Sequence, residues 1–145
     1  ALSVCRHNCK KHGVEDYVTL LCADLFQGID TGTVFSFIVA NPPYVRSSEI
    51  SDELEPEVAE FEPHLALDGG EDGLDCIRRI ARQVIMHLEP RGFFFMEFGA
   101  EQAKAVQSIF SGIEQEGRFF QNVKTFKDYS GRDRVLVAEL NHYSR

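Results

Sequence analysis

The sequence lacks several features that would place the protein in a membrane, in a secretory route or at a metal. Its apolar stretches are the length of strands and are interrupted by polar residues, so none predicts a membrane-spanning helix. No basic segment followed by an apolar one opens the chain, so we expect no secretory signal. The four cysteines have no C-x-x-C spacing, which argues against a zinc site. Their apolar neighbours predict reduced, buried thiols in a cytoplasmic protein.

Positive charge is also scarce. Fifteen Lys and Arg face 23 Asp and Glu, giving a net charge of −8, which disfavours a surface that binds nucleic-acid phosphates. The acidity is concentrated in residues 49–75, which contain eleven acids and no Lys or Arg. A charge run of this kind is usually a solvated loop that leads into a helix.

What is present is the pattern of an α/β domain. The 145 residues are 43% hydrophobic, which is enough for a core. The spacing of apolar residues predicts helices over 2–12, 71–88 and 100–116, and strands over 18–25, 34–40, 93–98, 120–127 and 134–140. The run 34–40 is almost continuously apolar, which is typical of a strand covered on both faces. We therefore expect a mostly parallel sheet with an antiparallel C-terminal hairpin.

The tetrapeptide Asn41-Pro42-Pro43-Tyr44 directly follows one of these strands. It can be a simple strand stop, because Asn-Pro is a common breaker. It also permits a specific chemistry: the Asn41 side-chain carbonyl and the Pro42 backbone carbonyl could accept two N–H groups of one planar amide or amine. Two such acceptors would hold the nitrogen in line with an electrophile, and Tyr44 would offer a wall for stacking.

Three segments carry a family resemblance. Residues 37–45 (Phe-Ile-Val-Ala-Asn-Pro-Pro-Tyr-Val) look like the signature of S-adenosylmethionine-dependent amino methyltransferases. Residues 62–75 and the Gly-Arg-Asp-Arg at 131–134 resemble segments of the HemK/PrmC family. The resemblance extends over residues 1–140. It implies methyl transfer to the glutamine side-chain amide of the Gly-Gly-Gln motif in peptide chain release factors, which would be the protein partner.

The resemblance also implies roles for individual residues. Those matching its catalytic positions are Asn41, Pro42 and Tyr44. Those matching its glutamine-binding positions are Asn41, Pro42, Pro43, Tyr44 and Glu62, and those matching its cofactor-binding positions are Asp24, Leu25 and Asn41. No metal is implied. Asp24 could equally be a polar residue leaving a strand, and Glu62 a solvated carboxylate. We interpret Glu97 as a buried group paired within the sheet, and Arg132 and Arg134 as a solvated hairpin tip.

Parts of the family pattern are missing from this sequence. None of the eleven glycines forms a G-x-G-x-G loop, so the S-adenosylmethionine site is expected to be incomplete. The resemblance implies a class I, Rossmann-like methyltransferase sheet that lacks its first two strands and the N-terminal helical domain. Residues 1–145 would be a partial catalytic domain, from strand 3 to strand 7. Strands 18–25 and 34–40 would then re-pair with one another, or the chain would form a homo-oligomer through exposed strand edges.

Three functional hypotheses remain at this point. The leading one is a release factor glutamine methyltransferase, an enzyme by resemblance, which is not expected to be active as this fragment. The second is a nucleic-acid adenine methyltransferase that uses the same Asn-Pro-Pro-Tyr loop on a flipped base; the net charge and residues 62–75 both disfavour it. The third is a non-catalytic fragment that recognises substrate but cannot hold cofactor.

Overall fold

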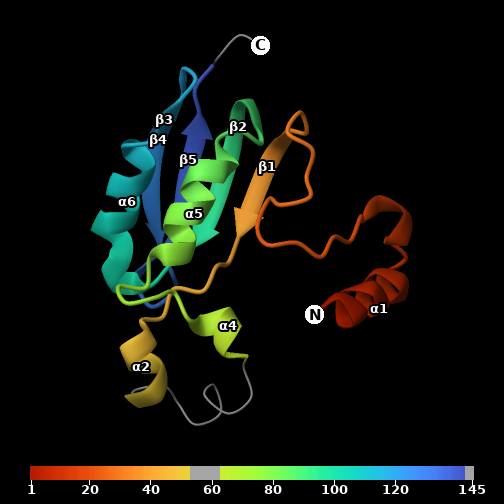
Figure 1. The fold of residues 1–145 in the computed structure, drawn as a ribbon, viewed down its shortest axis with the longest axis horizontal. Helices are drawn as coiled ribbons and strands as arrows, with labels where there is room; N and C mark the ends of the chain where they lie inside the picture. Colours follow the sequence, from red (N-terminus) through yellow and green to blue (C-terminus); the bar gives the residue numbers. More distant parts are fainter. Residues whose placement is uncertain (53–62, 143–145) are drawn as a thin grey trace.

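The structure is a computed structural model that describes residues 1–52 and 63–142. It has a mixed α/β fold with a five-stranded sheet in the order β1-β2-β5-β4-β3, and α5 and α6 lie against one face of this sheet (Figure 1). The strands are β1 (Phe35–Ala40), β2 (Leu88–Glu97), β3 (Glu114–Gln115), β4 (Arg118–Lys127) and β5 (Asp133–Leu140). The helices are α1 (Leu2–His12), α2 (Ser47–Asp52), α4 (His64–Leu67), α5 (Asp75–Val84) and α6 (Ala103–Ser111), with short 3₁₀ helices η1 (Glu15–Tyr17) and η2 (Ala100–Gln102).

The strand directions differ from the expected ones. Only β1 and β2 are parallel, and the other three pairs in the described sheet are antiparallel. The prediction of a mostly parallel sheet is therefore wrong. The reason is the C-terminal hairpin: β5 lies between β2 and β4 and runs against both of them. The hairpin itself is confirmed, with bounds close to those that the sequence predicts.

One hydrophobic core lies between the sheet and the two helices. α5 contributes the apolar stripe that its spacing predicts: Ile77, Ile80, Ala81 and Val84 are buried. Phe110 of α6 stacks on Phe94 of β2, with 5.3 Å between the ring centroids. Both helices are shorter than predicted. None of the helices in the described part of the chain is long and apolar enough to span a membrane.

The β1 edge and the opposite face of the sheet are less covered. The side chains of Phe37 and Val39 are 64% and 77% exposed, so the expectation of a strand covered on both faces is wrong. Among the described residues β1 pairs with β2 alone. The ring of Phe37 lies near those of Phe93 and Phe95, with centroid distances of 6.1 and 6.4 Å. These three rings form an apolar cluster on the face away from α5 and α6.

The N-terminal segment lies to one side of the sheet (Figure 1). α1 ends at Gly13, whose φ of 64° gives the left-handed C-cap that glycine favours, but the helix buries no residue. Residues 18–25 form no strand, because among the residues that the structure describes no strand lies beside them to supply the hydrogen bonds of a ladder. The predicted strand and its re-pairing with β1 are both wrong. The segment rejoins the core at Phe26, which stacks on His87 at 4.9 Å.

The cysteines differ in exposure, but none of them is buried. All four are free thiols: Cys5 and Cys22 are exposed, and Cys9 and Cys76 are half-buried. The prediction of buried thiols is therefore wrong. Cys5, Cys9 and Cys22 lie in the N-terminal segment, where none of residues 1–34 is buried. In the described ranges no three His, Cys, Asp or Glu side chains come together as metal ligands.

Candidate functional site

The Asn-Pro-Pro-Tyr loop (residues 41–44) leaves the sheet at the carboxyl end of β1, beside the end of β2. Ala40 pairs with Met96 in the parallel ladder, which stops here because Pro42 and Pro43 have no backbone N–H. Pro42 is buried and Asn41 is exposed. The Asn41 side-chain amide has no hydrogen-bond partner among the described residues. The loop therefore lies at the sheet edge where open α/β sheets bind ligands.

Tyr44 is fixed in place by two charged side chains. Its hydroxyl donates a hydrogen bond to Oε1 of Glu97 at 2.8 Å. The guanidinium of Arg134 lies 5.9 Å from the centroid of the Tyr44 ring, in the range of a cation–π contact, and its Nη1 is 3.4 Å from the hydroxyl. Burial raises the pKa of Tyr44, the Glu97 carboxylate raises it further, and Arg134 opposes the shift. The phenol is therefore held in its neutral, donating form.

The loop is also joined to the segment that precedes α5. The Val45 N–H donates to Leu67 O at 3.0 Å, and the Gly69 N–H donates back to Val45 O at 2.8 Å. The hydroxyl of Ser47 donates to Oδ1 of Asp68 at 2.7 Å. That hydrogen bond, with a second from a backbone N–H, lowers the pKa of Asp68. Segments 41–47 and 67–70, both singled out from the sequence, thus form one structural unit.

A hollow of about 690 Å³ lies on one side of the loop. Asp24, Leu25 and Pro43 line it together, so two residues predicted to bind cofactor lie beside one predicted to bind substrate. The Asp24 carboxylate pairs with the guanidinium of Arg79 and accepts a hydrogen bond of 3.3 Å from Gln27. Further lining residues include Gly69, Gly70, Asp75 and Cys76. Asn41 is not among the residues that line this hollow.

A second hollow of about 320 Å³ begins at the next residue of the loop. It is lined by Tyr44 and Val45, by Arg46 and Glu49 on one wall, and by residues 99–102 on the other. Consecutive loop residues, Pro43 and Tyr44, therefore line different hollows. Asn41 and Pro42, at the start of the loop, line neither of these two hollows.

Three further residues singled out from the sequence have different outcomes in the structure. Glu62 lies outside the described residues. Glu97 has a partner, but this partner is Tyr44 of the loop rather than another residue of the sheet. The interpretation of Arg134 as part of a solvated tip is wrong, because it packs on Tyr44 and donates to Phe98 O at 3.3 Å.

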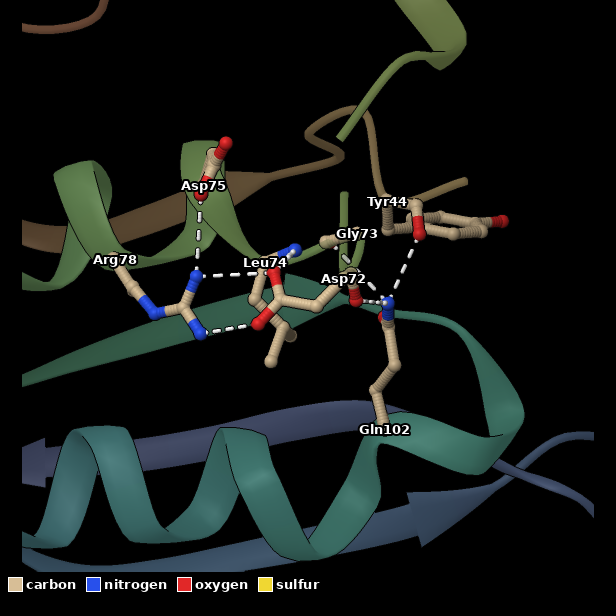
Figure 2. A network of polar contacts seen from close by, with 7 residues as sticks. All are labelled: Tyr44, Asp72, Gly73, Leu74, Asp75, Arg78 and Gln102. Atoms are coloured by element: carbon tan, nitrogen blue, oxygen red, sulfur yellow. Dashed lines mark hydrogen bonds and ion pairs between the residues drawn. The ribbon is translucent and has the colours of Figure 1, made fainter. Parts of the chain in front are cut away.

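Gln102 was not recognised from the sequence. It joins the loop to residues 72–73 through its side-chain amide (Figure 2). The only sequence signal for it is its position three residues after Gly99, the spacing of a helix N-terminal box.

Comparisons with known proteins agree with the sequence resemblance, although no family model matches the chain. The chain is 38% identical over 141 residues to a release factor glutamine methyltransferase of Caulobacter vibrioides, covering 97% of this chain and 46% of that protein. Proteins of the same name from Koribacter versatilis and Clostridium acetobutylicum are each 39% identical over 95% of the chain and over 46% and 47% of their own length.

The chain thus spans about half the length of the curated relatives it matches. The matched residues are in the C-terminal part of those proteins. The predicted resemblance to the release factor glutamine methyltransferases of the HemK/PrmC family is confirmed, and these relatives are named as methyltransferases.

Proposed function

We propose that this chain is the part of a release factor glutamine methyltransferase that binds the acceptor glutamine and lines one side of the S-adenosylmethionine site. Residues 1–145 would be the strand 3 to strand 7 part of a Rossmann-like class I catalytic domain. The observation that carries the proposal is the position of the 41–44 loop. It follows β1 directly, its residues Pro43 and Tyr44 line two different hollows, and Tyr44 is fixed by Glu97 and Arg134. The similarity to named methyltransferases over nearly the whole chain supports it.

The loop supplies the chemistry that amide methylation needs. The nitrogen of a glutamine carboxamide is a poor nucleophile, because its lone pair is delocalised into the carbonyl. The Asn41 side-chain carbonyl and the Pro42 backbone carbonyl would accept its two N–H groups, hold the nitrogen toward the methyl donor and stabilise the positive charge that develops on it. Tyr44 would exclude water and present a flat wall to the planar carboxamide. The Asn41 side chain is exposed and has no hydrogen-bond partner in the described ranges, which is consistent with a role in binding an external ligand.

The described residues fit one side of the cofactor. S-adenosylmethionine, when bound, supplies a methyl group on a sulfonium. The carboxylate of Asp24 could accept hydrogen bonds from the adenosine part, and Leu25 and Pro43 give apolar walls in a hollow of suitable size. The methionine part of the cofactor would lack its usual binding loop, because no G-x-G-x-G loop occurs among the eleven glycines. Asp24 and Leu25 would therefore hold only the adenosine side.

A calorimetric titration with short peptides tests the acceptor role. The chain should bind a peptide ending in Gly-Gly-Gln at least about tenfold more tightly than the matched Gly-Gly-Glu peptide, since a carboxylate has no N–H to donate. Asn41→Ala should remove this preference while leaving affinity for S-adenosylmethionine within about tenfold. Asn41 is exposed, so the variant should fold.

Equal affinity for the two peptides, or a preference that survives Asn41→Ala, would contradict the proposal. Preferential binding of an adenine-containing single strand would instead favour the nucleic-acid methyltransferase. Peptide binding without any S-adenosylmethionine binding would identify a chain that recognises the acceptor but does not hold the methyl donor.

A further inference from the structure

We propose that Gln102 is a positioning residue. Its side-chain amide fixes the Tyr44 end of the 41–44 loop against the turn at residues 69–73, and thereby sets the geometry of the acceptor site. This inference rests on the proposed function. It adds to it a residue that acts through its hydrogen bonds to the loop and the turn.

The side chain of Gln102 is buried, with 8% of its surface exposed, and all its polar atoms are used. Its Nε2 donates to Tyr44 O at 2.9 Å and to Gly73 O at 3.2 Å, with Asp72 O at 3.5 Å. Its Oε1 accepts a hydrogen bond of 2.9 Å from the Gly99 N–H. Figure 2 shows the amide between the Tyr44 carbonyl and the turn. One side chain thus joins the loop, the turn and the start of η2.

This position requires a neutral side chain that carries both a donor and an acceptor, as the Gln102 amide does. The two carbonyls of Tyr44 and Gly73 require donors, whereas the Gly99 N–H requires an acceptor. A carboxylate would face two carbonyl oxygens with no proton to share, and an ammonium would leave the Gly99 N–H unsatisfied. Because the group is buried, water could not readily replace a lost partner.

The backbone of Gly73 is tightly packed against the contact between Gln102 and Tyr44. We call the contacts of the Gln102 amide with Tyr44, Gly73 and Gly99 the joint. Gly73 has a φ of +73°, and a Cβ added there would lie 2.4 Å from Tyr44 O and 2.5 Å from Gln102 Nε2. The turn therefore approaches the loop as closely as glycine allows. At its other end Tyr44 is held by Glu97 through its hydroxyl. The ring is consequently fixed at two points, and release of the Gln102 amide would free its backbone end.

The test compares Gln102→Glu with Gln107→Glu. Gln107 lies in α6 and donates through Nε2 to Thr125 at 3.3 Å, so it is a matched amide outside the joint. We expect the Val45 and Gly69 amides, which join the loop to the preceding segment, to exchange hydrogen at least about tenfold faster in Gln102→Glu than in Gln107→Glu. The Phe94 and Leu136 amides of the core should exchange equally in both variants.

A spectroscopic probe reports on Tyr44 itself. In chain labelled with 3-fluorotyrosine, the Tyr44 fluorine signal, assigned by its loss in Tyr44→Phe, should shift in Gln102→Glu and stay in place in Gln107→Glu. Acidification should return it toward its original position, because protonation gives the introduced carboxyl group an O–H donor. A purely structural loss of stability would not be reversed in this way. If Gln102→Glu does not fold, Gln102→Met removes the hydrogen bonds at similar volume and should give the same shift.

The outcome separates this inference from the proposed function. The exchange and fluorine measurements need no ligand, so unchanged values in both Gln102 variants would overturn the inference whatever the chain binds. Binding of the Gly-Gly-Gln peptide should weaken at least about tenfold in Gln102→Glu. If amide exchange becomes faster in Gln102→Glu but its affinity for the peptide is unaltered, the inference would also be overturned. A wild-type chain that fails to bind the peptide would contradict the proposed function, and with it the acceptor-site part of the inference.

Discussion

Residues 1–41 and residues 74–141 contain similar local patterns but pack very differently. Each region has a helix with a one-sided apolar spacing and apolar runs the length of strands. None of residues 1–41 is buried, whereas Phe94, Phe110 and Leu136 are fully buried. The difference shows that an apolar run becomes a covered strand only where another strand and a helix lie against it.

β1, the last element of residues 1–41, shows the same rule within a single strand. It has one partner strand, and its exposed residues are Phe35, Ser36, Phe37 and Val39. Ile38 and Ala40 pack partly against the core. Burial therefore rises with the number of packed neighbours from residues 18–25, through β1, to β2 and β5. Paired substitutions, one in the core and one in residues 1–41, can test this relation between burial and packed neighbours.

The largest effect is expected in the core. Phe110→Ala should lower the free energy of unfolding by about 3–5 kcal/mol, because it leaves a cavity against Phe94 and Phe120. The matched change Leu21→Ala, at a side chain that is 52% exposed, should alter it by less than about 0.5 kcal/mol. Urea denaturation measures both. A loss at Leu21 comparable to that at Phe110 would show that the N-terminal segment is packed after all.

A second test concerns the open edge of β1. An uncharged, exposed edge strand is a template for pairing with another chain, so we expect the chain to self-associate in a concentration-dependent manner. Val39→Lys should raise the dissociation constant of this association at least about tenfold, measured by sedimentation velocity. Val4→Lys, at a 61% exposed residue of α1, is the control and should leave it unchanged. A chain that is monomeric at all concentrations would remove the prediction of a homo-oligomer.

The same comparison explains what could be predicted from the sequence. α5 and the C-terminal hairpin were predictable, because each carries its own periodicity or turn. The 41–44 loop was predictable from its residue types. The lack of a strand at 18–25 and the antiparallel directions of the sheet were not, since both depend on which strands pair, and a local pattern cannot specify that. Nor was the contact of Arg134 with Tyr44, because these residues are 90 positions apart and meet only when β5 lies beside β2.

A smaller effect is expected from Tyr44, which connects the end of β1 to β2 and β5. Burial and Glu97 raise its pKa from the ordinary value of 10.0, so the folded chain keeps this proton to higher pH than the unfolded chain. Unfolding then releases a proton, and the stabilisation, complete at neutral pH, falls as pH rises through 10.

Wild type should therefore lose more stability between pH 9 and pH 11 than Tyr44→Phe does, as measured by the urea midpoint. Tyr17→Phe, at a fully solvated residue of the N-terminal segment (88% exposed), should follow wild type. Identical pH profiles for Tyr44→Phe and wild type would show that the Glu97 contact does not hold the phenol neutral.

The smallest effect is expected at the ion pair that joins Asp24 of the N-terminal segment to α5. Arg79 of α5 pairs with Asp24, and both side chains are about half exposed, so Arg79→Ala should cost only about 0.2–1 kcal/mol. Salt should reduce that cost further. Arg82→Ala, on an exposed turn of the same helix, is the matched control for lost helix-surface charge. A loss above about 2 kcal/mol at Arg79, measured by urea denaturation, would mean that the segment around Asp24 contributes to the stability of the core. That segment and the core would then be a single cooperative unit, although none of residues 1–34 is buried.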